Sequence, residues 1–537
     1  MKVLMDILLN AAKYGGENKA QLDVYRDSEH IYTITYERLF FDAKRTASAF
    51  SEAGIKKGDY VVFQILDIIG YLYSFWACQV LGAIPVPLPV NVRKYNNSEN
   101  YNKIQNVRKE ISNSYILFED FQKELYENQD NSICITTVIA DLSKYPKHDL
   151  VDIFEEDVAF VQFSSGSTSA PKGVVLTHEN IIENMRQISE RLELEGTKCC
   201  ASWMPLTHDM GFVAFHLMPL KHFAHSILFA PELFVRNPMY FLNVVGQSEA
   251  EIIGLSNTMI EMILKIVKSR KPEGLNLSSL SCILNGSEPI NCSSAETFVS
   301  VFGEYGLPDD CMSYCYGMAE ASLVISLSKK RDNAYIRVNT DKYYHEEIEI
   351  DDNSNQIIPF VGQPLDGMDI IIIDSDEKIL EDGQIGEICI KGKNVMRGYL
   401  NKDNEEFFTK TGYFKTGDKG FIFENRVAIV GRIKDIIFKN GVNFYSHDLE
   451  RIICELFPEM TNKCAVVQED GKKANMIIFY VDRTIDENAE KFKKMNVELV
   501  KRVGFMLEEM KLVKEFPRTE GGKIQRFKLV SNYEDYT

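Results

Sequence analysis

Short apolar runs alternate with stretches of helical periodicity along the first 330 residues or so. The intervening stretches, such as 259–269 and 293–304, place apolar residues at helical spacing. Strands that alternate with helices of this length predict layered α/β sheets in which the strands run largely parallel. The strand candidates are YVVFQI (60–65), AIPVPL (83–88), YILF (115–118), ICITTVIA (133–140), VAFVQF (158–163), HSILFA (225–230), EIIGL (251–255) and SCIL (281–284).

The pattern changes from Asp369 onward. The runs DIIIID, GEICIKG and FIFENRVAIVG are typical of strands joined by turns, and they predict a small β subdomain. After GRIKD, the chain offers a helix (SHDLERIICELF), two strands (CAVVQ and MIIFYV) and a second helix from about Ala489. This order predicts a small α+β domain. We therefore expect two domains, at residues 1–432 and 433–537.

Charge supports the same division. The chain has 537 residues and a net charge of −18, yet residues 433–537 contain 18 basic and 18 acidic residues. The whole net charge of −18 therefore lies on the first domain, which suggests that the two domains meet different partners. The net charge of −18 argues against nucleic acid as a partner.

The N-terminus and the cysteines indicate a cytoplasmic protein. The first apolar run is interrupted by Asp6, as in an amphipathic helix rather than a secretory signal. The uncharged run 68–92 contains three prolines, so we expect a buried helix and a strand there, and no membrane span. Eleven cysteines without framework spacing argue for a reducing compartment.

The run SSGSTSAPKGVVLTH (164–178) is rich in Ser, Thr and Gly. A strand pattern precedes it and a helix pattern follows it, so we expect a strand-to-helix loop with Thr177 as the helix cap. Backbone amides, hydroxyls and the charge of Lys172 suit phosphate. The loop differs from the common G-x-x-x-x-G-K-[ST] motif, because here the lysine precedes Gly173.

Five further stretches accompany this loop in a fixed order: SWMPLTHDMGF, LNGSEPI, YGMAEAS, TGDKGFI, and the pair GRIKDIIFKNGVNFYSHDLE and GGKIQR. Together they resemble the adenylate-forming superfamily of acyl-CoA synthetases, peptide-synthetase adenylation domains and luciferases. PLTHDMG, NGSEPI and YGMAEAS look most like fatty acyl-AMP ligases, which transfer acyl groups to a carrier protein. The resemblance implies a large N-terminal domain of layered α/β sheets with a small β subdomain, and a small mobile α+β C-terminal domain.

The resemblance also implies a nucleotide site for ATP. Tyr316 would stack on adenine, with Gly286, Ser287 and Glu288 along its edge and Gly317 and Met318 in the same motif. The phosphates would be held by Ser164, Ser165, Gly166, Ser167, Thr168 and Lys172.

Further roles follow for the reacting groups. A carboxylate must attack the α-phosphate of ATP, so the site needs cations and hydrogen-bond donors. Lys523 would bridge the two as the catalytic residue, and Glu320 would act with it as the Mg²⁺ ligand. Asp418 would bind the ribose hydroxyls, Arg432 would make the second ribose or phosphate contact, and Lys434 would be the hinge.

The acyl substrate would lie beside Trp203, His208, Asp209, Met210 and Gly211, with His208 as the gate of an acyl tunnel. We expect a fatty or other carboxylic acid as substrate and an acyl carrier protein as acceptor, in lipid or secondary metabolite biosynthesis. Free CoA stays open as the acceptor, since the compact run after Asn401 shows no insertion that would restrict rotation of the C-terminal domain. An amino or hydroxy acid stays open because of Asp209, and a catalytically inactive nucleotide-binding protein is the third alternative.

Overall fold

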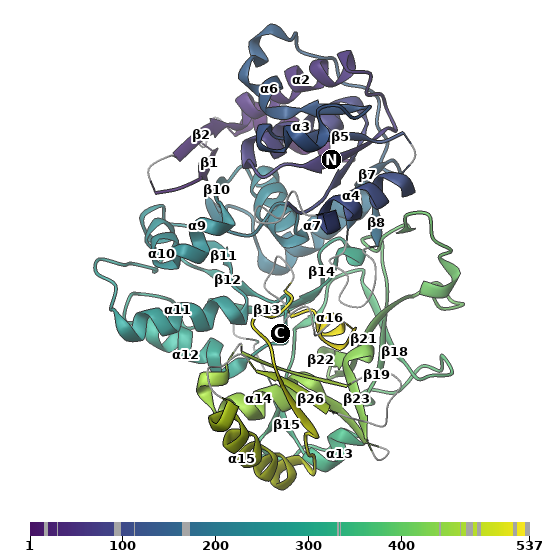
Figure 1. Ribbon diagram of the computed structural model, residues 1–537. Coiled ribbons are helices and arrows are strands. Elements are labelled where there is room, and N and C mark those ends of the chain that lie inside the picture. The colour runs from purple at the N-terminus through teal and green to yellow at the C-terminus, as the bar shows by residue number, and fades with distance from the viewer. Residues whose placement is uncertain are drawn as a thin grey trace.

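The largest sheet of the molecule has nine strands, and those from β13 to β1 run parallel. The computed structural model describes the whole chain except residues 16–19, 29–30, 91–97, 112, 164–171, 330–331, 333–334, 440–441, 462, 469–475, 481–484, 519–523 and 532–537 (Figure 1). In sheet order the strands are β17 (Gln363–Pro364), β14 (Val324–Leu327), β13 (Met312–Gly317), β12 (Cys282–Asn285), β11 (Ile252–Gly254), β9 (Cys199–Ser202), β10 (His225–Phe229), β1 (Gln21–Tyr25) and β2 (Ile31–Thr35).

Helices surround this sheet and bury its apolar side chains in the main core. They include the predicted amphipathic first helix and the predicted helices at 259–269 and 293–304. None of the helices in the described part of the chain is both long and apolar enough to cross a membrane. Their bounds are α1 (Leu4–Tyr14), α2 (Tyr36–Glu52), α3 (Ile68–Leu81), α7 (His178–Leu192), the π-helix η3 (Met210–Leu217), α8 (Met218–Lys221), α9 (Pro231–Arg236), α10 (Pro238–Gln247), α11 (Asn257–Ser269) and α12 (Cys292–Gly303).

A second sheet is entirely parallel, and it corrects one sequence prediction. Its order is β4 (Ile84–Pro87), β3 (Tyr60–Gln64), β5 (Tyr115–Phe118) and β6 (Ser132–Cys134). The run predicted as one strand at 133–140 forms only the end of β6 and then the helix α6 (Ile135–Ala140). On that helix Ile135 and Val138 are buried at a spacing of three, so packing overrides the β propensity of the run. The remaining helices here are α4 (Ser98–Glu110) and α5 (Lys123–Tyr126).

A three-stranded sheet corrects the predicted loop at 164–178. β7 (Val158–Phe163) pairs antiparallel with β8 (Gly173–Thr177), and β8 pairs with β20 (Gly398–Tyr399). The run GVVLT is therefore a strand, and the Ser/Thr/Gly segment connects two strands rather than a strand and a helix. Thr177 caps α7 as predicted, because its Oγ1 accepts a hydrogen bond of 3.2 Å from the Asn180 amide.

The β subdomain is an antiparallel sheet of β18 (Asp369–Ile373), β19 (Gly386–Lys391), β21 (Phe414–Phe423) and β22 (Arg426–Arg432). The C-terminal part follows it and lies in Figure 1 at the opposite end of the molecule from α2 and α3. Its elements are β23 (Ile436–Lys439), β24 (Val442–Tyr445), α14 (Ser446–Leu456), β25 (Cys464–Gln468), β26 (Met476–Tyr480), α15 (Ile485–Val503), β27 (Glu509–Leu512) and α16 (Arg526–Ser531).

A segment of the N-terminal part packs against these C-terminal elements. It comprises β15 (Tyr335–Val338), α13 (Thr340–Tyr344) and β16 (Gln356–Pro359), and we call it the β15–β16 segment. One hydrophobic cluster contains side chains of this segment together with side chains of β24 and α14. Gln356 donates to Asp448 Oδ1 (3.2 Å) and accepts from Arg451 (3.0 Å), while Asn443 donates to Glu346 (2.6 Å). These contacts cross the predicted domain boundary at residue 433.

Candidate functional site

Several predicted site residues lie at the carboxyl ends of neighbouring parallel strands. Trp203 directly follows β9, Gly286 directly follows β12, and Tyr316 and Gly317 end β13. Open α/β sheets bind their ligands at this edge, because loops diverge there and leave a crevice. The topology therefore brings together three motifs that are spread over residues 203–317 of the sequence.

Asp418 lies at the centre of the first polar cluster. Its Oδ2 accepts a hydrogen bond of 2.8 Å from the Tyr316 hydroxyl, and its Oδ1 is 3.1 Å from Arg432 Nε. Asp418 and Arg432 are direct partners across β21 and β22. The buried carboxylate raises the pKa of Arg432, and burial, with Asp418 adding to it, raises the pKa of Tyr316. The cluster thus holds a carboxyl group beside an aromatic ring.

Glu320 is the centre of the second polar cluster. It lies in the short helix η4 (Ala319–Ala321) just after β13, is half-buried, and accepts a hydrogen bond of 2.7 Å from the Tyr399 hydroxyl. Burial raises the pKa of Glu320, and the hydrogen bond from Tyr399 opposes that rise. A half-buried carboxylate of this kind offers the hard oxygen ligands that Mg²⁺ prefers.

Lys172 brings a positive charge to the same place. Its Nζ lies 4.7 Å from the ring centroid of Tyr399 and 4.0 Å from that of Phe407. Burial and the nearby charge of Lys434 lower the pKa of Lys172, whereas Glu320 raises it. A cation over two aromatic rings and near a carboxylate is suited to contact phosphate oxygens.

Two of the predicted glycines lie where no side chain fits. A Cβ at Gly317 would lie 1.7 Å from the Leu323 carbonyl oxygen, and a Cβ at Gly286 would lie 2.5 Å from Cys315 Sγ. Beside them, Glu288 accepts hydrogen bonds from the Thr258 amide (2.6 Å) and hydroxyl (3.0 Å) at the start of α11. The backbone of the NGSEPI motif is therefore held close to β13. Met318 directly follows Gly317 and precedes η4.

The predicted acyl motif lies next to the nucleotide motifs. Asp209 Oδ1 is 2.7 Å from His208 Nδ1 and accepts a 2.7 Å hydrogen bond from the Met210 amide. Ser287 Oγ is 3.9 Å from Met210 Sδ, which joins this motif to NGSEPI. Trp203 donates to the Gly254 carbonyl oxygen (3.1 Å) and is buried.

Gly211 allows the chain to turn tightly behind the acyl motif. A Cβ at this position would lie 2.2 Å from the Pro205 carbonyl oxygen. The substitution of any other residue would therefore displace the start of η3.

The remaining predicted residues are distributed as follows. Lys434 is exposed in the short helix η6 (Ile433–Asp435), just after Arg432. Lys523 and Ser164–Thr168 lie outside the described residues. Three further residues, Tyr399, Phe407 and Arg518, were not predicted from the sequence. Burial lowers the pKa of Arg518, and the nearby charge of Glu288 opposes this. No motif marks these three residues, and only the fold brings them to the site.

Comparisons with known proteins identify the family and the fold. The sequence profile of the AMP-binding enzyme family matches residues 10–400. The chain is 26% identical to a putative acyl-CoA synthetase of Caulobacter vibrioides, over 98% of this chain and 95% of the relative. It is 25% identical to the medium-chain fatty acid–acyl-carrier-protein ligase JamA of Moorena producens, over 97% and 93%. A solved structure from a study of fatty acyl-adenylate ligases of E. coli and L. pneumophila superposes with a TM-score of 0.88 at 24% identity, covering 100% of this chain and 98% of that one. The last likeness confirms the predicted α/β fold.

Proposed function

The chain belongs to the AMP-binding enzyme family, as its motifs predicted, and we propose from this that it activates a fatty acid with ATP. The carboxylate attacks the α-phosphate, pyrophosphate leaves, and an acyl-adenylate forms. The acyl group then passes to the phosphopantetheine thiol of an acyl carrier protein, with release of AMP. The observation that carries the proposal is the Asp418 cluster, in which a fixed carboxylate adjoins the Tyr316 ring at the carboxyl edge of the sheet.

We assign the following roles within the proposed reaction. Asp418 accepts hydrogen bonds from the two ribose hydroxyls, a geometry that suits a carboxylate with two oxygens. Lys172 contacts the outer phosphates of ATP, Glu320 holds Mg²⁺, and Lys523 bridges the attacking carboxylate and the α-phosphate. When bound, Mg²⁺ would neutralise phosphate charge and make pyrophosphate a better leaving group.

Asp209 bears on the alternative of an α-amino acid as substrate. In amino-acid-activating relatives an aspartate at this place pairs with the substrate amine. Here Asp209 already interacts with His208 (2.7 Å) and with the Met210 amide (2.7 Å). Both contacts fall on Oδ1 and orient the carboxylate without occupying Oδ2. The choice of a fatty acid over an amino acid therefore rests on the family motifs and on the relative JamA, which is named as a ligase of medium-chain fatty acids.

The β15–β16 segment supports a carrier protein rather than free CoA as acceptor. Fatty acyl-AMP ligases usually carry an insertion that restricts rotation of the C-terminal domain. In this chain the β15–β16 segment holds the C-terminal elements by hydrogen bonds and by a shared apolar cluster. Breaking these contacts would cost free energy whenever the domain turned. The relative JamA is named as a ligase of medium-chain fatty acids to acyl carrier protein.

The proposal also includes a reducing compartment, the cytoplasm. All eleven cysteines are free thiols, and most of them are buried. A disulfide framework is therefore no part of what stabilises this fold.

Acid-dependent exchange of radiolabelled pyrophosphate into ATP tests the adenylation step. We expect exchange with medium-chain fatty acids and none without an acid. Replacement of Lys523 by alanine should lower the exchange rate about 10²–10³-fold, because one charge contact to the reacting phosphate is lost. Exchange that proceeds equally well with amino acids and not at all with fatty acids would overturn the proposal.

A further inference from the structure

Two aromatic rings form a corner beside the ammonium group of Lys172, which we call the aromatic corner. The ring centroids of Tyr399 and Phe407 are 4.7 Å apart, and the two ring planes meet at 80°. The Nζ atom of Lys172 lies over both rings, 4.7 Å from the first centroid and 4.0 Å from the second. An aromatic face attracts a cation through its quadrupole and, unlike a carboxylate, does not neutralise the charge. The corner can therefore hold the ammonium group without cancelling its charge.

The backbone of β20 fixes the first ring of the aromatic corner. β20 pairs with β8 so that Tyr399 lies opposite Val174. The Leu400 amide then donates a hydrogen bond of 2.8 Å to the carbonyl oxygen of Gly173, the residue that follows Lys172. The pairing of these two strands thus places the Tyr399 ring beside the lysine.

The short helix η5 (Glu405–Phe407) supplies the second ring of the corner. Its N-cap residue, Asn404, ties the helix to β20, because Asn404 Oδ1 accepts a hydrogen bond of 3.0 Å from the Tyr399 amide. The Phe407 amide in turn donates to the Asn404 carbonyl oxygen (3.1 Å). These two hydrogen bonds hold Phe407 in a defined position relative to Tyr399.

Tyr399 also connects the aromatic corner to the second polar cluster. Its hydroxyl donates a hydrogen bond of 2.7 Å to Glu320, while Lys172 lies over its ring. In the proposed reaction these two charged residues have separate roles, since Glu320 holds Mg²⁺ and Lys172 contacts the outer phosphates of ATP. One tyrosine therefore sets the positions of both groups, and Phe407 packs against that tyrosine.

We propose that Phe407 is a positioning residue for the adenylation step. Its ring, together with that of Tyr399, places the ammonium group of Lys172 against the two outer phosphates of ATP, which leave as pyrophosphate. The inference rests on the proposed function. It gives the run NKDNEEFF (401–408), which no motif marks, a part in phosphate binding.

Replacement of Phe407 by leucine keeps an apolar side chain and removes the ring. In pyrophosphate exchange with the full chain, the KM for ATP and the KM for pyrophosphate should each rise about three- to tenfold, as expected for the loss of one cation–π contact. Phe407→Tyr keeps the ring and should restore both values. Phe408→Leu is the matched control, because Phe408 is also half-buried but its ring packs on Phe414 (5.5 Å). This control should leave both KM values unchanged.

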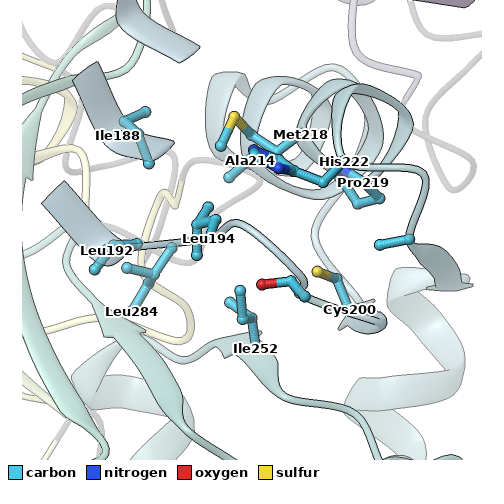
Figure 2. Close-up of a pocket in the computed structure, with 12 residues that line it drawn as sticks. Ile188, Leu192, Leu194, Cys200, Ala214, Met218, Pro219, His222, Ile252 and Leu284 are labelled. Atoms are coloured by element: carbon cyan, nitrogen blue, oxygen red, sulfur yellow. The ribbon is translucent and has the colours of Figure 1, made fainter. Parts of the chain in front are cut away.

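The acid and the acyl-adenylate provide readouts that the proposal leaves unchanged. Helix η3 begins in the predicted acyl motif, and with α8 and the nine-stranded sheet it lines an apolar cavity (Figure 2), to which Ala214, Met218 and Leu284 contribute. None of the described residues that line this cavity belongs to β20 or η5. The KM for dodecanoic acid should therefore stay the same in Phe407→Leu. Transfer from preformed acyl-adenylate should also stay the same, because that intermediate has lost the outer phosphates.

A double-mutant cycle tests whether Phe407 acts through the lysine. In Lys172→Met the ammonium group is absent, so Phe407→Leu should have no further effect on the KM for ATP. A rise confined to ATP and pyrophosphate, and lost in the Lys172→Met background, would support the proposal. Unchanged KM values in Phe407→Leu, an equal rise for dodecanoic acid, or equal effects in both backgrounds would overturn this inference alone. Absence of exchange with every acid in the wild type would overturn the proposed function, and this inference with it.

Discussion

At the residue scale, the sequence identifies individual polar residues of the site but not the hydrogen bonds between them. The motifs YGMAEAS and TGD single out Tyr316 and Asp418, but not the bond between them, because 102 residues separate the two. The hydrogen-bond partner of Glu320 is even harder to predict from the sequence. Tyr399 lies 79 residues further on, in a short strand that no motif marks, and yet its hydroxyl meets the carboxylate at 2.7 Å. Such pairs depend on the register of strands in different sheets, which periodicity does not reveal.

Replacement of Asp418 by asparagine tests the proposed ribose contact. The variant loses the charge that pairs with Arg432 and weakens the hydrogen bonds to the ribose hydroxyls. A charge-assisted hydrogen bond contributes about 1.5–3 kcal/mol, so the KM for ATP should rise roughly 10–100-fold. Steady-state exchange at varied ATP measures this effect. Asp382→Asn makes the same change at an exposed position and should leave the KM unchanged, and an unaltered KM in the Asp418 variant would refute the assignment.

The acid limb of the pH–rate profile tests the role of Glu320. Burial raises the pKa of this carboxyl, and the Tyr399 hydrogen bond lowers it. Tyr399→Phe keeps the ring below Lys172 but removes the hydroxyl, so the pKa of Glu320 should rise further. If the anion is the form that holds Mg²⁺, activity will be lost at a higher pH as the solution is acidified. An acid limb that stays in place, or moves to lower pH, would exclude this role; exposed Tyr335→Phe is the control.

At the element scale, most strands and helices follow from the sequence, and the exceptions have physical reasons. The helix predicted at 259–269 begins at Asn257, and the strand predicted at 158–163 is β7 with the same bounds. GVVLT appeared to belong to a loop because its neighbours are Ser, Thr and Gly. Its β-branched residues nevertheless pair with β7, with register partners such as Val161 and Val175. Long-range pairing decided that element, and local composition did not.

The predicted hinge residue, Lys434, lies in the short helix η6, which follows β22. Lys434 is exposed there, so a substitution should leave the packing intact. Proline fixes φ near about −65° and should hinder rotation of the C-terminal domain. In Lys434→Pro we therefore expect normal formation of acyl-adenylate and slow transfer to the carrier. Single-turnover assays of the two half-reactions measure this, with Lys434→Ala as the control for lost charge. Equal slowing of both half-reactions would contradict a hinge at this residue.

At the scale of the whole molecule, charge and packing act on the two predicted domains in different ways. The acidic first domain should repel an acidic carrier protein, which leaves the neutral C-terminal part as the place to dock. On α15, Lys493 and Lys494 are exposed, and Lys494 pairs with Glu490 of the same helix (3.1 Å). Lys491 and Arg502 are less exposed and form ion pairs with Glu459 (3.2 Å) and Glu455 (3.0 Å). Which of these cations form ion pairs could not be predicted from the sequence.

Reversal of the two exposed lysines tests docking on α15. Lys493→Glu combined with Lys494→Glu should slow transfer to the carrier several-fold at low salt, because contacts at the rim of an interface act mainly on the association rate. The difference from the wild type should shrink at high salt, and pyrophosphate exchange should not change. The same reversal at the exposed Lys265 and Lys268 of α11 controls for net charge. If both double variants behaved alike, docking on α15 would be refuted.

The most direct test of the whole account is a competition between the two acceptors. The protein is incubated with ATP, Mg²⁺, dodecanoic acid and equal amounts of a phosphopantetheine-loaded carrier protein and free CoA, and the products are identified by mass spectrometry. We expect AMP, an acyl-adenylate intermediate and dodecanoyl carrier protein, with little dodecanoyl-CoA. Formation of dodecanoyl-CoA without any loaded carrier, or the absence of acyl-adenylate altogether, would contradict it.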